Sequence, residues 1–104
     1  MKAISTTEEF QQIIDSPKTV IIKFETSWCP DCKRLNMYVD ELVQEFTFEW
    51  FSCDRDQFPQ LEEKYDVLGI PSLLAFKNGK KTDHLRADDK APDEIRAYLK
   101  ALDA

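Results

Sequence analysis

The sequence predicts an α/β fold with a central mixed β-sheet of four to five strands, flanked by about four helices. Hydrophobic residues make up 42% of the 104 residues, which is enough for one core of ordinary size. Helix-like and strand-like segments alternate, as is typical of parallel strands joined by helices. Asn78 and Gly79 form a hairpin signal that adds antiparallel strands. We therefore expect a single domain spanning residues 1–104.

The N-terminal part predicts a capped helix and a buried strand. Thr6 and Glu9 fit a capping box, in which both side chains satisfy backbone N–H groups at the start of a helix. Pro17 ends this helix. Residues 19–26 are rich in β-branched and aromatic side chains, which predicts a strand. A short first strand is expected near residues 2–4.

One long helix is expected from about residue 29 to residue 46. Its apolar residues recur at helical spacing: Leu35, Val39, Leu42, Val43 and Phe46. Residues 47–53 predict a second buried strand, in which Phe48, Trp50 and Phe51 are core residues. Because strand, helix and strand follow one another, the two strands are expected to be parallel, with a right-handed crossover.

The C-terminal part predicts a short helix, a hairpin and a final helix. The short helix follows Pro59, and the hairpin joins strands at residues 72–76 and 81–86. The last helix opens at Pro92, since proline is favoured in the first helical turn. The expected buried faces of the two helices are Leu61, Tyr65 and Leu68, then Ile95, Tyr98, Leu99 and Leu102.

Composition and charge argue against several classes of protein. The chain carries 14 Lys and Arg against 20 Asp and Glu, whereas nucleic-acid and anionic-membrane binding need clustered basic residues. The longest apolar run is Leu73 to Phe76, too short to span a membrane. The first residues show no apolar segment typical of a signal peptide. We therefore expect a cytoplasmic protein with neither nucleic-acid nor membrane partners.

Residues 28–33, with the sequence Trp-Cys-Pro-Asp-Cys-Lys, lie where the first strong strand is expected to pass into the long helix. Cys29 would be the N-cap, Pro30 the first helical residue and Asp31 the second. Proline and carboxylates both favour these positions. Unpaired N–H groups at the start of a helix stabilise a thiolate, so this placement predicts a reactive cysteine.

The two-residue spacing brings the sulfurs of Cys29 and Cys32 within reach across one helical turn. We expect an exposed Cys29 to attack a disulfide, and Cys32, one turn inside, to release the product. Zinc is not expected, because a structural site needs four ligands, usually in two close pairs. The remaining candidates, Cys53 and His84, are far apart in the sequence; we expect Cys53 in the core and His84 facing solvent. Inert packing of the cysteines remains an alternative.

Three segments together resemble the thioredoxin family: residues 28–33, Gly-Ile-Pro-Ser at 69–72 and Phe-Lys-Asn-Gly at 76–79. The order of predicted elements also resembles that family over nearly the whole chain. The resemblance implies the thioredoxin fold, with Cys29 as the nucleophile and Cys32 as the resolving thiol.

The resemblance also implies a cis bond between Ile70 and Pro71, facing the cysteines. The intrinsic preference of X–Pro bonds alone favours trans. Trp28 and Ile70 would flank a substrate groove. The implied substrate-binding residues are Trp28, Pro30, Asp31, Ile70 and Pro71.

Several positions depart from the family pattern. Pro30 and Asp31 replace the usual Gly-Pro pair, and this variant also resembles small thioredoxin-related proteins that prefer small or selected disulfides. Lys23 stands where the family has a buried aspartate, and Glu25 where it has a tryptophan. Ser52, Met37 and Ala87 replace a lysine, a helix-kinking proline and a groove-lining glycine.

Lys23 and Glu25 are two residues apart on one predicted strand, so their side chains project from the same face. We expect an ion pair between them, because a buried lysine without a partner is costly. In that arrangement Glu25 could accept the proton of Cys32 while Lys23 favours thiolates. The alternative is that both side chains reach solvent and serve only solubility.

These observations predict a thioredoxin-like protein-disulfide reductase with roles in electron transport and cell redox homeostasis. No bound cofactor is expected beyond the redox-active Cys29–Cys32 disulfide. A flavin-dependent thioredoxin reductase would reduce that disulfide, and the chain is expected to be a monomer. Two alternatives stay open: a reductase of small-molecule or glutathione-type mixed disulfides, and a non-catalytic binding subunit with the same fold.

Overall fold

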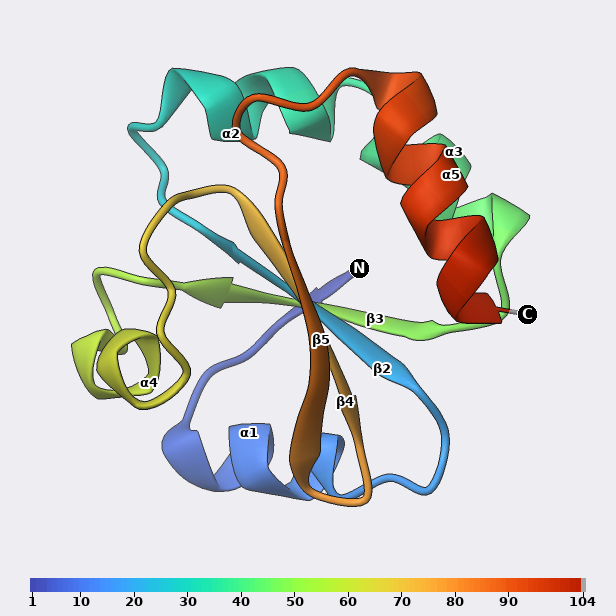
Figure 1. Ribbon diagram of the computed structural model, residues 1–104. Helices are drawn as coiled ribbons and strands as arrows, with labels where there is room; N and C mark the ends of the chain where they lie inside the picture. Colours follow the sequence, from blue (N-terminus) through green and yellow to red (C-terminus); the bar gives the residue numbers. More distant parts are fainter. Residues whose placement is uncertain (104) are drawn as a thin grey trace.

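The computed structural model describes residues 1–103, which form one five-stranded mixed sheet between two layers of helices (Figure 1). The strand order is β1-β3-β2-β4-β5. β1 and β2 both pair in parallel with β3, and β4 pairs antiparallel with β2 and β5. The predicted mixed sheet is confirmed. The strands are β1 (Lys2–Ala3), β2 (Val20–Glu25), β3 (Glu49–Asp54), β4 (Ser72–Lys77) and β5 (Lys80–Arg86).

The helix expected from residue 29 to residue 46 is interrupted, so residues 1–103 contain five helices rather than about four. The N–H groups of Met37 and Tyr38 bond to carbonyls three residues back, at 3.2 and 3.1 Å. Tyr38 then leaves the helical conformation, with φ −133°. The single-helix prediction is wrong because no proline or glycine marks this break. The helices are α1 (Thr7–Ile14), α2 (Pro30–Asn36), α3 (Val39–Glu45), α4 (Pro59–Lys64) and α5 (Pro92–Asp103).

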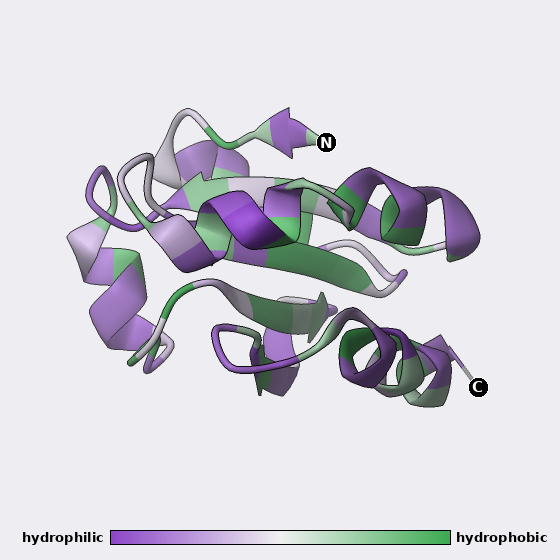
Figure 2. Ribbon diagram, turned by 90° about the horizontal axis from the view of Figure 1, so that it is seen from above, coloured by the Kyte–Doolittle hydropathy of each residue, from purple (hydrophilic) through white to green (hydrophobic). Residues whose placement is uncertain are grey.

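Each face of the sheet is covered by its own helices. α1 and α4 pack with Val20, Ile22 and Phe24 of β2, whereas α2, α3 and α5 pack with Ile21 of the same strand. Figure 2 shows the hydrophobic strands between helices whose outer surfaces are largely hydrophilic. β2 is therefore buried on both faces, and the active-site segment follows its carboxyl end. Within residues 1–103, no helix is both long and apolar enough to cross a membrane.

The aromatic residues in and just before β3 divide between the two faces of the sheet. Phe48 and Trp50 pack on the side of α2, α3 and α5, and Phe51 packs on the side of α1 and α4. Trp50 is buried as predicted, whereas Phe48 and Phe51 are only partly buried and pack against the core. Leu68 differs from its prediction, because its side chain is 84% exposed. α4 ends before it, and Asp66, with φ 57°, turns the chain away from the helical direction.

Two local sequence patterns, the hairpin turn and the helix cap, form the structures that they predict. Asn78 and Gly79 have φ values of 54° and 81°, which suit the tight turn of a two-residue hairpin. The Thr6 hydroxyl accepts the N–H of Glu9 at 3.0 Å and caps α1. The Glu9 carboxylate in return accepts the N–H of Ser5 at 2.8 Å, one residue earlier than in the standard capping box.

Candidate active site

Cys29 and Cys32 lie at the junction between β2 and α2. Cys29 is the N-cap of α2 and has extended backbone angles, and Pro30 is the first helical residue. The Cys29 sulfur accepts the backbone N–H of Cys32 at 3.1 Å. One of the unpaired N–H groups of the first helical turn therefore points at the sulfur of Cys29, where it can stabilise negative charge.

The side chain of Cys29 is less exposed than the sequence suggests. It is only 5% exposed, and Cys32 is 1% exposed. The expectation of an exposed Cys29 is wrong, because the loop that carries Ile70 lies against the thiol. The Cys29 thiol points at the Ile70 carbonyl oxygen at 3.9 Å. Cys29 remains the more accessible of the two cysteines.

Cys32 is held in its protonated form. The pKa of its thiol is raised from an ordinary 9.0 to about 12, first by burial and next by the hydrogen bond with Cys29. The negative charges of Cys29 and Glu25 act in the same direction, whereas a backbone hydrogen bond from Thr26 opposes them. At neutral pH Cys32 therefore needs a proton acceptor before it can act as a nucleophile.

The loop before β4 faces the cysteines through a cis peptide bond between Ile70 and Pro71. The Ile70–Pro71 bond is thus cis although X–Pro bonds intrinsically prefer trans. The cis bond that the family resemblance implies is confirmed. The Pro71 carbonyl accepts the N–H of Ala87 at 2.9 Å, and the Ser72 hydroxyl donates to the Gly69 carbonyl at 2.6 Å. These bonds fix the loop from both sides, so the Ile70 carbonyl is held in place beside Cys29.

Trp28 lies on the surface next to Cys29, with its side chain 59% exposed. Its indole N–H donates to a carboxylate oxygen of Asp56 at 2.7 Å. The Arg55 guanidinium lies 6.0 Å from the ring centroid, a geometry that allows a cation–π contact. Trp28 therefore presents an aromatic face at the site rather than filling the core.

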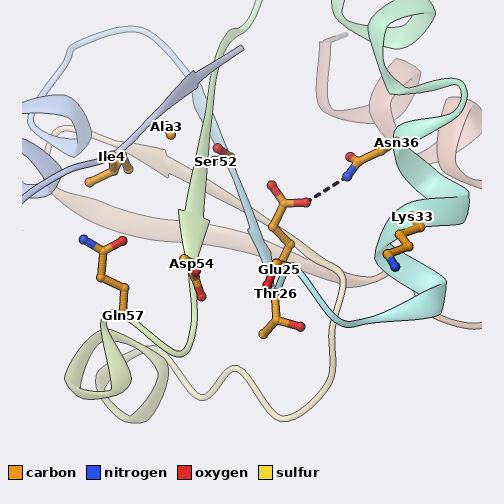
Figure 3. A pocket seen from close by; sticks show the side chains of 10 residues that line it. Ala3, Ile4, Glu25, Thr26, Lys33, Asn36, Ser52, Asp54 and Gln57 are labelled. Carbon is orange, nitrogen blue, oxygen red and sulfur yellow. Dashed lines mark hydrogen bonds between the residues drawn. The ribbon is translucent and has the colours of Figure 1, made fainter.

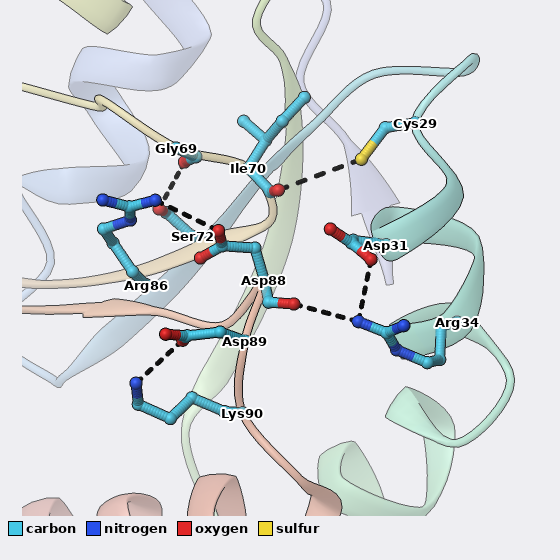
Figure 4. Close-up of polar contacts among 10 residues, drawn as sticks. All are labelled: Cys29, Asp31, Arg34, Gly69, Ile70, Ser72, Arg86, Asp88, Asp89 and Lys90. Carbon is cyan, nitrogen blue, oxygen red and sulfur yellow. Dashed lines mark hydrogen bonds and ion pairs between the residues drawn. The ribbon is translucent and has the colours of Figure 1, made fainter.

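Charged residues form a chain of contacts near Cys29 and the Ile70 loop (Figure 4). Arg34 bonds to the Asp31 carboxylate at 2.8 Å and to the Asp88 carbonyl at 2.9 Å. Asp88 pairs in turn with Arg86 at 3.1 Å, and the Arg86 guanidinium lies against Gly69. Sequence reasoning identified Asp31 but missed the other charged residues, because Arg34 and Asp88 meet across 54 positions of sequence.

Lys23 and Glu25 form the expected ion pair, with 3.2 Å between the Lys23 ammonium nitrogen and a Glu25 carboxylate oxygen. Lys23 is only 5% exposed, so the alternative in which both side chains reach solvent is wrong for Lys23. Lys23 also donates to the side-chain oxygen of Asn36, and the Asn36 amide N–H donates to Glu25 at 3.0 Å. Asn36 was missed, although it lies one helical turn after Cys32 on α2 and shares its side of the helix.

A cavity of about 330 Å³ opens beside Glu25 (Figure 3). Most of its lining residues carry a carboxylate, amide or hydroxyl group, and one carries an ammonium group. The lining residues are Ala3, Ile4, Glu25, Thr26, Ser27, Lys33, Asn36, Ser52, Asp54 and Gln57. The cavity gives the Glu25 carboxylate, whose side chain is 21% exposed, a route to water.

The remaining candidate residues lie outside this site. Cys53 is fully buried in the core, and burial raises the pKa of its thiol to about 12. The expected solvent-facing position of His84 is wrong, because its ring is half-buried and burial lowers its pKa. Within residues 1–103, no three His, Cys, Asp or Glu side chains lie close enough together to hold a metal ion.

Comparison with known proteins supplies the family. The family model for Thioredoxin matches residues 2–101. The chain belongs to the thioredoxin family. Thioredoxins are protein-disulfide oxidoreductases, and the Cys29–Cys32 pair at the start of α2 is consistent with their CxxC site.

Among the similar thioredoxins, one from Mycoplasmoides gallisepticum is 31% identical over 96% of this chain and its own full length. The chloroplastic thioredoxin M3 of Oryza sativa subsp. japonica is 31% identical over 97% of this chain, which spans only 59% of that relative. The chain also spans only 44% of the chloroplastic thioredoxin M4 of Arabidopsis thaliana.

Solved thioredoxin structures share the fold. The oxidised thioredoxin of Plasmodium falciparum superposes with a TM-score of 0.86 at 25% identity, covering 100% of this chain and 99% of that one. The thioredoxin of Malassezia sympodialis superposes with a TM-score of 0.85 at 26% identity, covering 99% of this chain and 93% of that one. The predicted thioredoxin fold is confirmed.

Proposed function

We propose that this chain reduces disulfide bonds of proteins, with Cys29 as the nucleophile and Cys32 as the resolving thiol. The observation that carries this proposal is the hydrogen bond of 3.1 Å from the Cys32 N–H to the Cys29 sulfur at the first turn of α2. This bond can stabilise negative charge on the Cys29 sulfur during exchange, while burial keeps Cys32 protonated. The two thiols therefore differ in the way that a two-step exchange requires.

In the first step, the Cys29 thiolate attacks one sulfur of the substrate disulfide. The substrate S–S bond breaks, one substrate sulfur leaves as a thiolate, and a mixed disulfide with Cys29 forms. In the second step, Cys32 loses its proton and attacks the Cys29 sulfur. The Cys29–Cys32 disulfide forms, the second substrate sulfur leaves as a thiolate, and two electrons have passed to the substrate.

We place the target segment between the Trp28 ring and the loop of Ile70 and Pro71, with Pro30 and Asp31 at the helical edge of the groove. The exposed indole supplies an apolar contact surface. The cis bond leaves the Ile70 carbonyl directed at Cys29, so substrate binding has to displace that contact from the thiol.

We further propose that Glu25 accepts the proton of Cys32 in the second step. Its negative charge is among the influences that raise the pKa of Cys32, so the two groups interact electrostatically. Lys23, paired with Glu25 at 3.2 Å, offsets the negative charge that a second thiolate would add. Glu25 borders the cavity, which gives the accepted proton a path to solvent.

The proposed cycle needs a partner that reduces the Cys29–Cys32 disulfide again, and we propose a flavin-dependent reductase for this role. The dithiol is itself the redox group, so the proposed reaction calls for no bound cofactor. A reducing compartment such as the cytoplasm favours the reducing direction over disulfide formation. We propose that the chain acts there as a monomer, in electron transport and redox homeostasis.

Two variants test the assignment of the cysteines. Cys29→Ser is expected to abolish reduction of insulin disulfides, because the attacking thiol is lost. Cys32→Ser is expected to accumulate mixed disulfides through Cys29, which non-reducing electrophoresis and mass spectrometry of a cell extract would detect. Adducts on Cys29→Ser instead would show that the two roles are reversed.

The same assay separates the alternatives. A reductase of small disulfides would reduce glutathione disulfide much faster than insulin. A non-catalytic binding subunit would retain its partner when both cysteines are serine, and wild-type protein would show no turnover with dithiothreitol as the reductant. The proposed function requires turnover of insulin that depends on both cysteines.

A further inference from the structure

Among the side chains of residues 1–103, Asn36 is the one that hydrogen-bonds to both Lys23 and Glu25 of the ion pair beside the cysteines. Lys23 can only donate hydrogen bonds, so the Asn36 side-chain oxygen must face Lys23. The Asn36 amide N–H groups then necessarily face Glu25, to which one of them donates at 3.0 Å. The orientation of the amide is fixed by this chemistry.

The three side chains form a closed ring. One Glu25 oxygen accepts from Asn36, and the other pairs with Lys23 at 3.2 Å. The ring joins two elements, since Lys23 and Glu25 lie on β2 and Asn36 is the last residue of α2. The Glu25 carboxylate is therefore held by donors from both sides of the junction between strand and helix.

This ring lies on the side of α2 that carries the resolving thiol. Cys32 and Asn36 are one helical turn apart, a spacing that places two side chains on the same side of a helix. Glu25 and Asn36 both border the cavity, and the Glu25 side chain is 21% exposed. Without the Asn36 donor, the Glu25 carboxylate keeps only the contact with Lys23 on its own strand, and nothing from α2 holds it beside Cys32.

We propose that Asn36 is a positioning residue that holds the Glu25 carboxylate in place to take the proton of Cys32 during resolution. This inference rests on the proposed role of Glu25. Asn36 touches neither substrate nor sulfur and acts only through Glu25. The proton leaves the Cys32 sulfur, is taken by a Glu25 oxygen, and returns to solvent through the cavity, while the Cys32 thiolate displaces the substrate sulfur from Cys29.

The test is stopped-flow kinetics of wild type and Asn36→Leu with a disulfide peptide whose release changes fluorescence, from pH 6 to pH 9. Attack by Cys29 and resolution by Cys32 are measured as separate phases. Asn36→Leu is expected to slow resolution about tenfold, the effect of losing one hydrogen bond to a charged group. The attack rate is expected to stay unchanged. The pH profile of resolution in Asn36→Leu is expected to match that of Glu25→Gln.

A matched control and a double variant distinguish positioning from general disturbance. Gln57→Leu removes another exposed amide that lines the same cavity and is expected to leave both phases unchanged. The double variant Glu25→Gln/Asn36→Leu is expected to resolve the mixed disulfide no more slowly than Glu25→Gln alone, because both substitutions remove the same function. If Asn36→Leu fails to fold, Asn36→Ala replaces it.

Three outcomes would overturn the positioning role: unchanged resolution in Asn36→Leu, equal slowing in Gln57→Leu, or additive slowing in the double variant. A different result would refute the proton-acceptor role itself, namely wild-type resolution rates and pH profile in Glu25→Gln. Slow resolution in Glu25→Gln combined with normal resolution in Asn36→Leu would refute only the positioning role.

Discussion

The buried thiol of Cys53 gives a quantitative test of which cysteines take part in the chemistry. Replacing Cys29 and Cys32 by serine leaves Cys53 as the single thiol. Burial raises its pKa from an ordinary 9.0 to about 12, so at pH 8 only about 10⁻⁴ of it is thiolate, against about 10⁻¹ for an ordinary cysteine. Since only the thiolate reacts with iodoacetamide, the folded protein is expected to react about 10³-fold more slowly than the same chain in urea.

The pH dependence checks the cause of this protection. Below pH 12 each added pH unit raises the thiolate fraction about tenfold, so the alkylation rate is expected to rise about 100-fold from pH 8 to pH 10. Mass spectrometry of timed samples measures the rate, and circular dichroism at each pH controls for unfolding. Stoichiometric alkylation of the folded double variant within the time that the unfolded chain requires would refute the assignment of Cys53 to an inert core position.

Two further predictions concern stability and substrate binding. Phe10→Ala is expected to lower the free energy of unfolding by about 4 kcal/mol, because the buried ring packs edge-on against Phe76 at a centroid distance of 5.7 Å. Urea denaturation measures this loss, and Met37→Ala, at an exposed position, is the control. Arg34→Ala removes the hydrogen bond between α2 and the Asp88 carbonyl. It is expected to raise KM for protein disulfides up to about fivefold with kcat unchanged. An equal loss of kcat would contradict a role confined to the groove.

The features that the sequence predicts well depend on short-range physics. The N-cap position of Cys29 follows from Pro30 in the first turn of a helix, and the hairpin follows from Asn78 and Gly79, which tolerate positive φ. The break between α2 and α3 could not be predicted in this way. Met37 carries no backbone restriction, and the interruption appears only in the hydrogen bonds of the folded chain.

The parts of the site that sequence reasoning missed all depend on contacts across the fold. Arg34 meets the Asp88 carbonyl across 54 positions of sequence, and no periodicity relates the two. Asn36 contacts β2 across 13 positions at Lys23, and its importance appears only once α2 is known to lie beside that strand. The exposure of His84 was predicted wrongly, because the sequence around a single residue on an edge strand does not indicate which side chains cover it.

The substitution of a lysine for the family's buried aspartate changes the charge balance beneath the cysteines. A lone carboxylate there would add one negative charge next to a thiol that must itself become negative. In this chain Lys23, Glu25 and Asn36 form a ring whose net charge is zero when the carboxylate is ionised. If Glu25 takes the proton of Cys32, the ring becomes positive at the moment the thiolate forms. The pair of charges created in that step is then one of opposite signs, which is favourable at short range in a buried site.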